Sequence, residues 1–379
     1  MDKPLVAFNA QLLSGAASYR AAGIAGYIAN LLRRLPAGDP GLSYAALLGE
    51  GILPEGLDVR SVRTRFPTQR PTVRILWEQL LLPSVLRRIG ATLLHAPAFV
   101  GPLFSACPQV ITVHDLSFLR YPHFFRRGNR TYLSALTKPA CRRAAALIAG
   151  SEFIAHEITS LLGVPRERIH VIYHGIDPFF HPLPAGEVAT FRKKAGLPER
   201  FILYVGTLEP RKNLRRLVRA FAKLPMHDVH LIMAGGKGWL YQEIFAEVER
   251  LGLQDRVHFP GYVAAETLNL WYNAAEASAY LSLYEGFGFP VLEALACGVP
   301  TLASATASLR EAAGDGALLA PPEDEDAIAE GLLRLLSDAD LRADLQQRGL
   351  HHAQQFSWEK TAHQTTTVYR KVIGERAKI

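Results

Sequence analysis

The chain alternates short apolar runs with longer stretches of helical period, and this pattern occurs twice along its 379 residues. A short apolar run bounded by glycine or polar residues is typical of a strand that is buried on both faces. Strands that alternate with helices form a parallel sheet covered by helices. Because the pattern restarts after a proline-rich segment, the sequence predicts an α/β protein with two doubly wound parallel-sheet domains that face a cleft.

The apolar runs place the expected elements. In the first half we expect strands at 5–8, 92–95, 110–113, 146–149 and 170–173 and a helix over 24–35, with Ser151 capping another helix. In the second half we expect strands at 201–205 and 230–234, a helix from Asn213, and apolar runs at 279–283 and 300–303.

Prolines mark the expected domain boundary. Pro182, Pro184 and Pro198 lie close together and are accompanied by Gly186. Such a segment is typical of an exposed connection, so we expect a linker at 181–198 between domains 1–180 and 199–356.

Composition sets the class of protein. The chain is 49% hydrophobic and 20% charged, which is typical of a globular protein. No apolar run approaches the roughly 18 residues of a membrane span, and the chain leads straight into a strand, so no signal peptide is expected. Cys107, Cys141 and Cys297 lack metal-ligand spacing and are expected to be small core residues in a reducing cytoplasm.

Positive charge is concentrated in the first half of the chain. Residues 1–190 carry a net charge of about +8, and residues 191–379 carry about −1. This favours an anionic partner, such as a phosphorylated acceptor or an acidic membrane surface, although a charge that only aids solubility is the alternative. The basic and aromatic run at 120–127 has no nucleic-acid motif beside it, so no nucleic-acid partner is expected.

One apolar segment with basic neighbours allows two interpretations. Residues 73–82 are largely apolar, and Arg87 and Arg88 follow them. The segment either rests on a membrane interface or packs as a helix on the first domain. Pro83 and the small polar face favour packing.

Two carboxylates bracket a glycine loop and the start of a helix. Glu285 and Glu293 lie eight positions apart, with Pro290 suited to the first helical turn and Gly298 to a left-handed C-cap. Glu285 is then expected just outside the helix and Glu293 inside it. The N–H groups of residues 286–288 would face the same space, where they could bind phosphate or sugar oxygens. A dipole partner and a solvated helix residue are the alternatives.

Basic residues follow the first strand of the second half. Arg211 and Lys212, in the segment 206–213, are expected at the mouth of a helix, where two cations can neutralise a diphosphate without a metal. His114 follows the strand at 110–113 and is therefore expected at the carboxyl end of the first sheet, where ligands bind in such folds.

The remaining candidates give weaker signals. The loop after the first strand contains Gly15, Gly23 and Gly26, which would allow close approach to a phosphate or an acceptor, but it lacks the dinucleotide fingerprint G-x-G-x-x-G. Residues 324–326 are acidic, but they open an amphipathic helix, so capping explains them better than metal binding. No metal site is expected.

Together these motifs resemble the retaining glycosyltransferases of family 4, which have the GT-B fold of two Rossmann-like domains. The resemblance spans nearly the whole chain, and Glu285 to Glu293 is its most specific part, followed by 206–213. His114–Asp115, residues 171–177 and residues 356–358 also resemble the family. It implies that the helix in 357–379 packs back on the N-terminal domain. The family loop Arg-Gly-Ile-Gly-Arg-Tyr is Ala-Gly-Ile-Ala-Gly-Tyr here, at 22–27.

The resemblance implies a role for each candidate residue. Glu285 would contact the donor sugar, and Glu293 the nucleotide ribose. Arg211 and Lys212 would bind the diphosphate, and His114 would lie near the reacting carbon. The amides of Gly286, Phe287 and Gly288, after Gly206 in the preceding loop, would support phosphate and sugar.

The implied reaction is metal-independent transfer of a sugar, with retention, from a nucleotide-diphosphate donor to a hydroxyl of a glycan or lipid-linked acceptor. Similarity to bacterial mannosyltransferases of surface-polysaccharide synthesis favours GDP-mannose. UDP- and dTDP-sugars remain alternatives, as do a non-catalytic nucleotide-sugar-binding subunit and a nucleotide-sugar epimerase. The expected location is cytoplasmic, at or near the inner face of the membrane.

Overall fold

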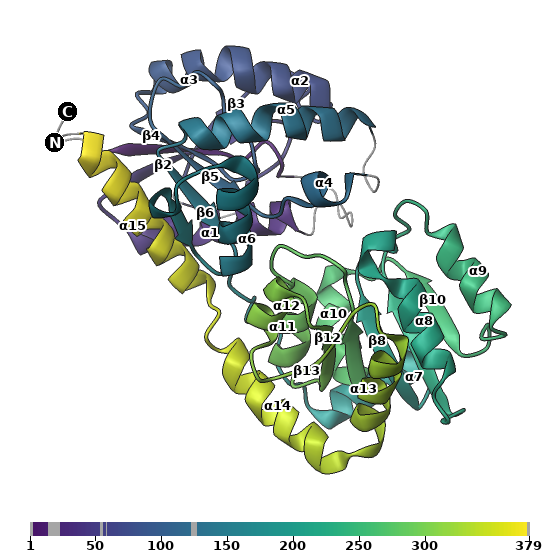
Figure 1. Ribbon diagram of the computed structural model, residues 1–379. Coiled ribbons are helices and arrows are strands. Elements are labelled where there is room, and N and C mark those ends of the chain that lie inside the picture. Colours follow the sequence, from purple (N-terminus) through teal and green to yellow (C-terminus); the bar gives the residue numbers. More distant parts are fainter. Residues whose placement is uncertain (1–2, 14–22, 54–55, 58, 123–126, 377–379) are drawn as a thin grey trace. The chain divides into compact units, whose positions relative to one another are not determined.

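The structure is a computed structural model that describes residues 3–13, 23–53, 56–57, 59–122 and 127–376. The chain divides into two compact units. Unit 1 comprises Met1–Gly175 and Ser357–Ile379, and unit 2 comprises Ile176–Phe356. Each unit is built around one parallel sheet (Figure 1).

Unit 1 contains a sheet of seven strands in the order β3-β2-β1-β4-β5-β6-β7. The strands are β1 (Leu5–Asn9), β2 (Ser43–Leu48), β3 (Arg60–Arg63), β4 (Leu93–Ala96), β5 (Gln109–Val113), β6 (Ala146–Ala149) and β7 (Ile169–Val171). The helices are α1 (Ile24–Gly38), α2 (Pro71–Leu76), α3 (Leu82–Ile89), α4 (Ser117–Arg120), α5 (Arg127–Arg143), α6 (Glu152–Glu157) and α15 (Trp358–Arg376), with short turns η2 (Trp77–Leu81), η4 (Ile158–Leu162) and η5 (Arg166–Arg168).

Unit 2 contains a sheet of six strands in the order β10-β9-β8-β11-β12-β13. The strands are β8 (Arg200–Val205), β9 (Val229–Ala234), β10 (Val257–Gly261), β11 (Ala277–Tyr280), β12 (Thr301–Ser304) and β13 (Leu318–Ala320). The helices are α7 (Ala185–Ala195), α8 (Leu214–Ala222), α9 (Gln242–Arg250), α10 (Leu268–Ala274), α11 (Phe289–Ala296), α12 (Ala307–Ala313), α13 (Glu325–Ser337) and α14 (Ala339–Ala353), with short turns η6 (Pro210–Lys212) and η7 (Ala265–Thr267).

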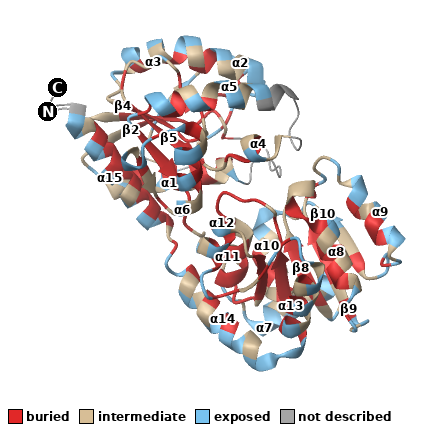
Figure 2. Cartoon of the chain, in the orientation of Figure 1, coloured by how far each residue is buried: buried red, intermediate tan, exposed pale blue. Residues whose placement is uncertain are grey.

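Burial of both sheet faces explains the apolar runs in the sequence. Successive side chains of a strand point to opposite faces, so the residues of β8 divide between two cores. Ile202 and Tyr204 pack in the core formed with α8, α9 and α13. Phe201 and Leu203 pack in the other core with Tyr272 of α10. Figure 2 shows the central strands buried beneath helices that are exposed on their outer sides.

The prediction of two doubly wound parallel α/β domains is confirmed. Every strand predicted in the first half is present, as are β8 and β9. The apolar runs at 279–283 and 300–303 correspond to β11, which begins and ends earlier, and to β12. The strands β2, β3, β10 and β13 were not predicted from the sequence. β2 contains two alanines, β3 is exposed, β10 contains a proline and β13 is only three residues long. Their apolar pattern in the sequence is therefore weak.

The expected linker at 181–198 is instead largely helical. It contains α7 and lies within unit 2, whose boundaries fall at 175/176 and 356/357. Val188 and Phe191 of α7 pack against the core around Tyr272, and Arg192 donates hydrogen bonds to the carbonyl oxygens of Ala274 and Pro198. The prolines that suggested a linker stand before and after this helix, where they are compatible with helix ends.

The last helix, α15, is part of unit 1. It packs along α1 and also contacts β6. Ion pairs join the two helices at Arg34–Glu359 (2.6 Å) and join α15 to Asp39 through Arg370 (2.5 Å). None of the described helices combines the length and apolar character needed to cross a membrane.

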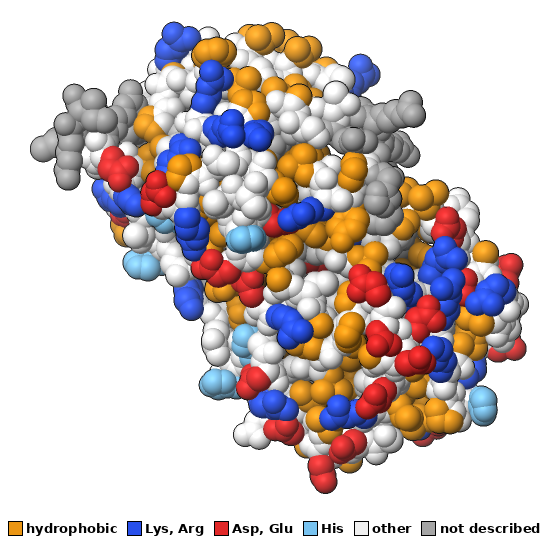
Figure 3. All heavy atoms as spheres, in the orientation of Figure 1, with side chains coloured by type: hydrophobic (Ala, Val, Ile, Leu, Met, Phe, Trp, Pro, Cys, Tyr) orange, Lys and Arg blue, Asp and Glu red, His pale blue; other side chains and the backbone are white. Residues whose placement is uncertain are grey.

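The two units differ in the charge of their visible surfaces. In Figure 3, acidic and basic side chains are interspersed over α8, α9 and α13, whereas acidic side chains are sparse over α2, α3 and α5. The interspersed charges of unit 2 form a connected network of ion pairs.

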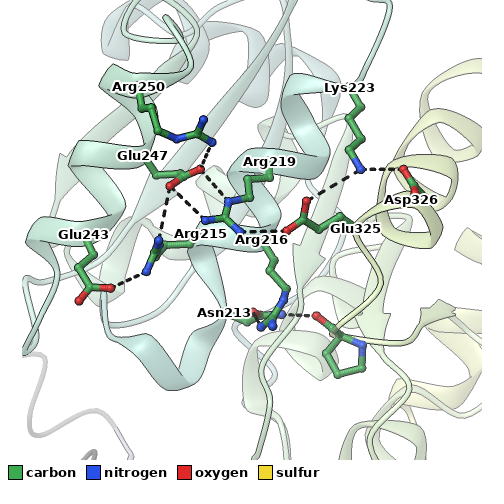
Figure 4. A network of polar contacts seen from close by, with 11 residues as sticks. Asn213, Arg215, Arg216, Arg219, Lys223, Glu243, Glu247, Arg250, Glu325 and Asp326 are labelled. Carbon is green, nitrogen blue, oxygen red and sulfur yellow. Dashed lines mark hydrogen bonds and ion pairs between the residues drawn. The ribbon is translucent and has the colours of Figure 1, made fainter.

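Glu247 of α9 lies at the centre of this network (Figure 4). Its carboxylate accepts hydrogen bonds from Arg219 of α8 (2.7 Å) and from Arg250, and Arg215 lies 3.7 Å away. Arg219 also pairs with Glu325 of α13 (3.2 Å). These hydrogen bonds, which outweigh the effect of burial, lower the pKa of Glu247 to about 2. The network therefore fixes α8 between α9 and α13.

We expect Glu247→Gln to lower the free energy of unfolding by about 1–3 kcal/mol at pH 7, because Arg219 and Arg250 lose the buried carboxylate that they share. A carboxyl with a lowered pKa stabilises the fold above its unfolded value near 4.5 and loses this effect as the pH falls toward 2. The difference between variant and wild type, measured by urea unfolding, should therefore shrink at pH 3. Glu243→Gln is the control, since Glu243 is exposed and, among the described residues, forms an ion pair only with Arg215. Equal effects of the two variants would contradict this role.

Candidate active site

The candidate site of unit 2 lies at the point where the strand order reverses. The chain runs outward from β8 through β9 to β10 and then returns to β11, which pairs with the other edge of β8. Loops that follow the two strands at such a reversal lie side by side at the carboxyl ends of the strands. The loop after β8 carries Arg211 and Lys212, and the loop after β11 carries Glu285.

These loops are joined by a buried cluster of charges. Lys212 Nζ donates to Glu285 Oε1 (2.5 Å) and to the Tyr280 hydroxyl (2.6 Å), and this hydroxyl donates to Glu285 Oε1 (3.0 Å). Arg211 binds Glu285 Oε2 through Nη1 (3.1 Å) and Glu209 Oε1 through Nη2 (2.9 Å). Glu285 is 9% exposed and Lys212 8%. Two cations and two carboxylates thus balance one another.

The cluster fixes the charge of Glu285. Burial alone would raise the pKa of this carboxyl, but the charges of Arg211 and Lys212 outweigh burial and lower the pKa to about 2. Burial lowers the pKa of Lys212 from its ordinary value, and the charge of Glu285 opposes this change. Glu285 is therefore a permanent hydrogen-bond acceptor at neutral pH and is not a proton donor.

Backbone geometry places Arg211 and Lys212. They form the short turn η6, which ends at Asn213 in a left-handed conformation (φ 61°). Asn213 Nδ2 donates to the carbonyl of Pro322 (2.6 Å), and Leu283 N donates to the carbonyl of Arg211 (2.9 Å). Gly206, where the loop begins, has φ 151°, and a Cβ there would lie 2.6 Å from the Tyr204 hydroxyl. The loop is therefore held on both sides and leaves no room for a side chain at 206.

The glycine loop leads into α11 as the sequence predicts. Pro290 lies in the first turn, and Gly298 (φ 72°) follows the last turn in a left-handed conformation. Gly288 at the N-cap has φ 113°, and a Cβ there would clash with Leu309. Phe287 is buried and its ring packs near that of Phe356 (centroids 5.9 Å apart). The side chain of Phe287 therefore anchors the loop.

Glu293 lies within α11, as expected, but its environment differs from that of Glu285. Its Oε2 accepts a hydrogen bond from the Tyr272 hydroxyl (2.8 Å), and no Lys or Arg of the described residues forms an ion pair with it. Burial raises the pKa of Glu293 to about 7, although the Tyr272 hydrogen bond opposes this change. The two glutamates are thus in opposite states at slightly acidic pH, with Glu285 ionised and Glu293 protonated.

Metal ligands do not converge in the part of the chain that the structure describes, where no group of three or more His, Cys, Asp or Glu side chains could hold an ion. Asp324 accepts hydrogen bonds from the N–H groups of Asp326 and Ala327, so it caps α13 as predicted. Cys107, Cys141 and Cys297 are buried free thiols, as expected for small core residues.

His114 follows β5 in unit 1. Its Nε2 lies 2.7 Å from the carbonyl oxygen of Pro97, which follows β4. A carbonyl can only accept, so Nε2 carries the proton. Burial lowers the pKa of His114, which keeps the ring neutral at physiological pH and leaves Nδ1 as the acceptor nitrogen.

Aromatic residues hold His114 in place. The Tyr27 ring of α1 contacts it edge-on with centroids 4.9 Å apart, and the His174 ring lies 5.5 Å away. Trp358 of α15 stacks on His174 at 6.2 Å. The Tyr27 hydroxyl hydrogen-bonds Thr112 Oγ1 (3.1 Å). The surroundings of His114 thus include residues from both ends of the chain.

The glycine candidates of the first loop are only partly described. Gly15 lies outside the described residues. Gly23 caps α1 with an ordinary φ of −78°, and Gly26 lies within that helix. A Cβ at either position would meet no atom within 4 Å. The fold of unit 1 therefore does not itself require glycine at these positions.

Three further residues of the site were not predicted from the sequence. Glu209 pairs with Arg211, Tyr280 bridges Lys212 and Glu285, and Tyr272 binds Glu293. Tyr280 is the last residue of β11, so its place at a strand end was a usable signal. Tyr272 lies 21 positions before Glu293 on another helix, and no local pattern indicates that contact.

Two family sequence models match the chain. The model described as Glycosyltransferase Family 4 matches residues 21–179, and the one described as Glycosyl transferases group 1 matches residues 187–352. The chain is 36% identical over 280 residues to O-antigen chain mannosyltransferase B of Escherichia coli, with 73% of each chain covered. The chain belongs to the group 1 glycosyltransferases.

Two further similarities concern a second relative and the fold. The glycosyltransferase is 34% identical over 239 residues to a D-inositol 3-phosphate glycosyltransferase of Kribbella flavida, covering 59% of this chain and 56% of the relative. It matches the solved structure of sucrose-phosphate synthase from Thermosynechococcus elongatus with a TM-score of 0.78 and 24% identity, over 99% and 100% of the two chains. At this identity the match concerns the fold, which is GT-B with two Rossmann-like domains, as the sequence predicts.

The pKa of Glu293 gives a direct test of the site geometry. We expect its carboxyl carbon to titrate near pH 7 in carbon-13 NMR of protein labelled at glutamate, with the signal assigned by its loss in Glu293→Gln. Tyr272→Phe should raise the midpoint further, because the hydroxyl stabilises the ionised form. A raised carboxyl pKa means that this group favours the folded state less as the pH rises from 4.5 to 7, so Glu293→Gln should flatten that part of the stability profile. A midpoint near 4.5 would contradict the geometry.

Proposed function

We propose that this protein is a retaining, metal-independent glycosyltransferase that transfers mannose from GDP-mannose to a hydroxyl of a glycan or lipid-linked acceptor. The observation that carries the proposal is the buried cluster of Arg211, Lys212 and Glu285 at the point where the strand order of unit 2 reverses. Such a reversal is where doubly wound sheets bind nucleotides. Similarity to O-antigen chain mannosyltransferase B supports mannose as the sugar.

Arg211 and Lys212 can stabilise the negative charge of a diphosphate leaving group. As the bond between the sugar carbon and the diphosphate oxygen breaks, negative charge accumulates on the leaving group, and fixed cations stabilise it. Both side chains are already held by carboxylates and by Tyr280, so little reorganisation is needed when the donor binds. This charge stabilisation supplies the role that a divalent metal has in other transferases.

Glu285 suits the donor sugar. Because its pKa is about 2, its carboxylate stays ionised and can accept hydrogen bonds from sugar hydroxyls. Glu293 can bind the ribose of the donor nucleotide, because an ionised carboxylate can accept hydrogen bonds from both ribose hydroxyls. Neutral His114, with Nε2–H bound to Pro97, would present an acceptor nitrogen at the carboxyl end of the sheet of unit 1.

In the proposed reaction, the acceptor oxygen bonds to the sugar carbon on the face from which the diphosphate leaves. The acceptor proton passes to the departing diphosphate oxygen, and the nucleoside diphosphate is released. The configuration of the sugar carbon is thereby retained without a glycosyl–enzyme bond, so Glu285 and Glu293 act in binding and not as nucleophiles.

Loss of Lys212 should affect turnover specifically. We expect Lys212→Ala to lower kcat by roughly 10²-fold, the size typical of removing one preorganised charge partner of the transition state. The assay would follow release of nucleoside diphosphate with a glycan acceptor present. Lys194→Ala is the control, because Lys194 is exposed on α7 of the same unit. A near-wild-type rate for a folded Lys212→Ala protein would exclude this role.

The donor can be identified by calorimetric titration with GDP, UDP, dTDP and ADP in EDTA. We expect GDP to bind most tightly, and binding to persist in the chelator. Below pH 7 binding should weaken as Glu293 becomes protonated, and Glu293→Gln should reduce this dependence. Preference for UDP or dTDP would overturn the donor assignment, and a requirement for added metal would overturn metal independence. Absence of binding by all four would contradict the donor site itself.

A further inference from the structure

A helical rod on the surface of unit 1 presents apolar side chains on two opposite faces. It consists of α2, η2 and α3, which follow one another without a break. Trp77, Leu82 and Leu86 on its inner face pack in a core cluster of unit 1. On its outer face, Leu76, Leu80 and Leu81 are 59%, 67% and 40% exposed. Packing within unit 1 therefore does not explain the apolar character of Leu76, Leu80 and Leu81.

A second segment extends the exposed apolar surface. The side chain of Gln79 donates from Nε2 to the carbonyl of Gly101 (3.2 Å) and accepts from Leu103 N (3.0 Å). These bonds tie the loop after β4 to the rod. The next residue, Phe104, is 75% exposed. Leu76, Leu80, Leu81 and Phe104, named here the leucine face, thus come from two segments held together by one glutamine.

The segments that form the leucine face carry mostly positive charge. Residues 60–143 contain 14 Lys and Arg but only two acidic residues. One of these, Glu78, is buried and accepts a hydrogen bond from Asn9 (3.0 Å), and the other, Asp115, accepts one from Ser117 N (2.9 Å).

Arginines stand at the borders of the face. Arg70 precedes the rod, Arg87 and Arg88 lie in its last turn, and all three are exposed. The guanidinium of Arg143 lies 5.3 Å from the centre of the Phe104 ring. Figure 3 shows hydrophobic side chains over α2 and α3 with basic ones beside them and no acidic ones on that part of the visible surface.

We propose that the leucine face and its arginines rest on the interface of a bilayer that contains anionic lipid. Leucine and phenylalanine side chains on a helical surface enter the boundary between headgroups and acyl chains, while arginines at its borders stay level with the phosphates. Each basic residue near an anionic surface strengthens binding by roughly fivefold. The two carboxylates within 60–143 are both engaged in hydrogen bonds, which limits the charge repulsion that such a surface would impose.

This inference is independent of the proposed reaction. It concerns residues of unit 1 that do not belong to the donor cluster of unit 2. It also resolves the two interpretations of residues 73–82, because the segment packs on the domain through one face and leaves the other for the membrane.

The test is sedimentation of the full chain with vesicles. Wild-type protein should bind vesicles of equal parts phosphatidylglycerol and phosphatidylcholine, bind phosphatidylcholine alone at least tenfold more weakly, and dissociate as salt is raised. Leu76→Ser combined with Leu80→Ser should weaken binding to the anionic vesicles by roughly tenfold or more, as should Arg87→Gln combined with Arg88→Gln. Leu240→Ser, at a leucine of unit 2 that is 52% exposed, is the matched control and should not change binding.

Thermal unfolding followed by circular dichroism, measured on each variant, should be unchanged and shows that the fold is intact. The proposal is overturned if the wild type does not bind anionic vesicles, or if the two double variants bind as well as the wild type. It is also overturned if sedimentation without lipid shows a dimer that the leucine substitutions dissociate, since the face would then be covered by a second copy of the chain.

Discussion

The pairing of Lys212 and Arg211 with Glu285 is the interaction on which the donor site depends. A buried charge is tolerated only when opposite charges and hydrogen bonds compensate for lost water. Glu285 receives hydrogen bonds from Lys212, Arg211 and Tyr280, and Arg211 is shared with Glu209. Removing Glu285 would take away the carboxylate that Lys212 and Arg211 share. The cluster therefore constrains two loops to one geometry and presets the charges that the proposed donor would meet.

The sheet makes this pairing possible. Arg211 and Glu285 are 74 positions apart, yet β8 and β11 are neighbours. The chain completes the β8-β9-β10 half before it returns, so the two loops meet only when both halves of the sheet are formed. The Glu247 network adds to this by fixing α8, whose N-terminus is Asn213, directly after Lys212.

Burial and neighbouring charges together set the protonation states of the buried titratable groups. Glu285 has a pKa near 2 because cations overcome burial, whereas Glu293, with only a tyrosine hydroxyl beside it, has a pKa near 7. His114 is neutral because burial lowers its pKa. Glutamate is thus a permanent anion at position 285, in the loop before α11, and a group that titrates near neutrality at position 293, within that helix.

The sequence alone determined the two doubly wound domains, the glycine loop before α11 and the strand ends that carry His114, Arg211 and Lys212. These features are local, because apolar runs, glycine and proline act through the backbone of their own segment. It could not determine the helix α7, since prolines at helix ends look like those of a linker. Nor could it find Glu209, Tyr280 and Tyr272 as partners, or divide residues 73–82 into an inner and an outer face. Those features depend on which segments the sheet brings together and on how much water each side chain keeps, and only the tertiary structure decides both.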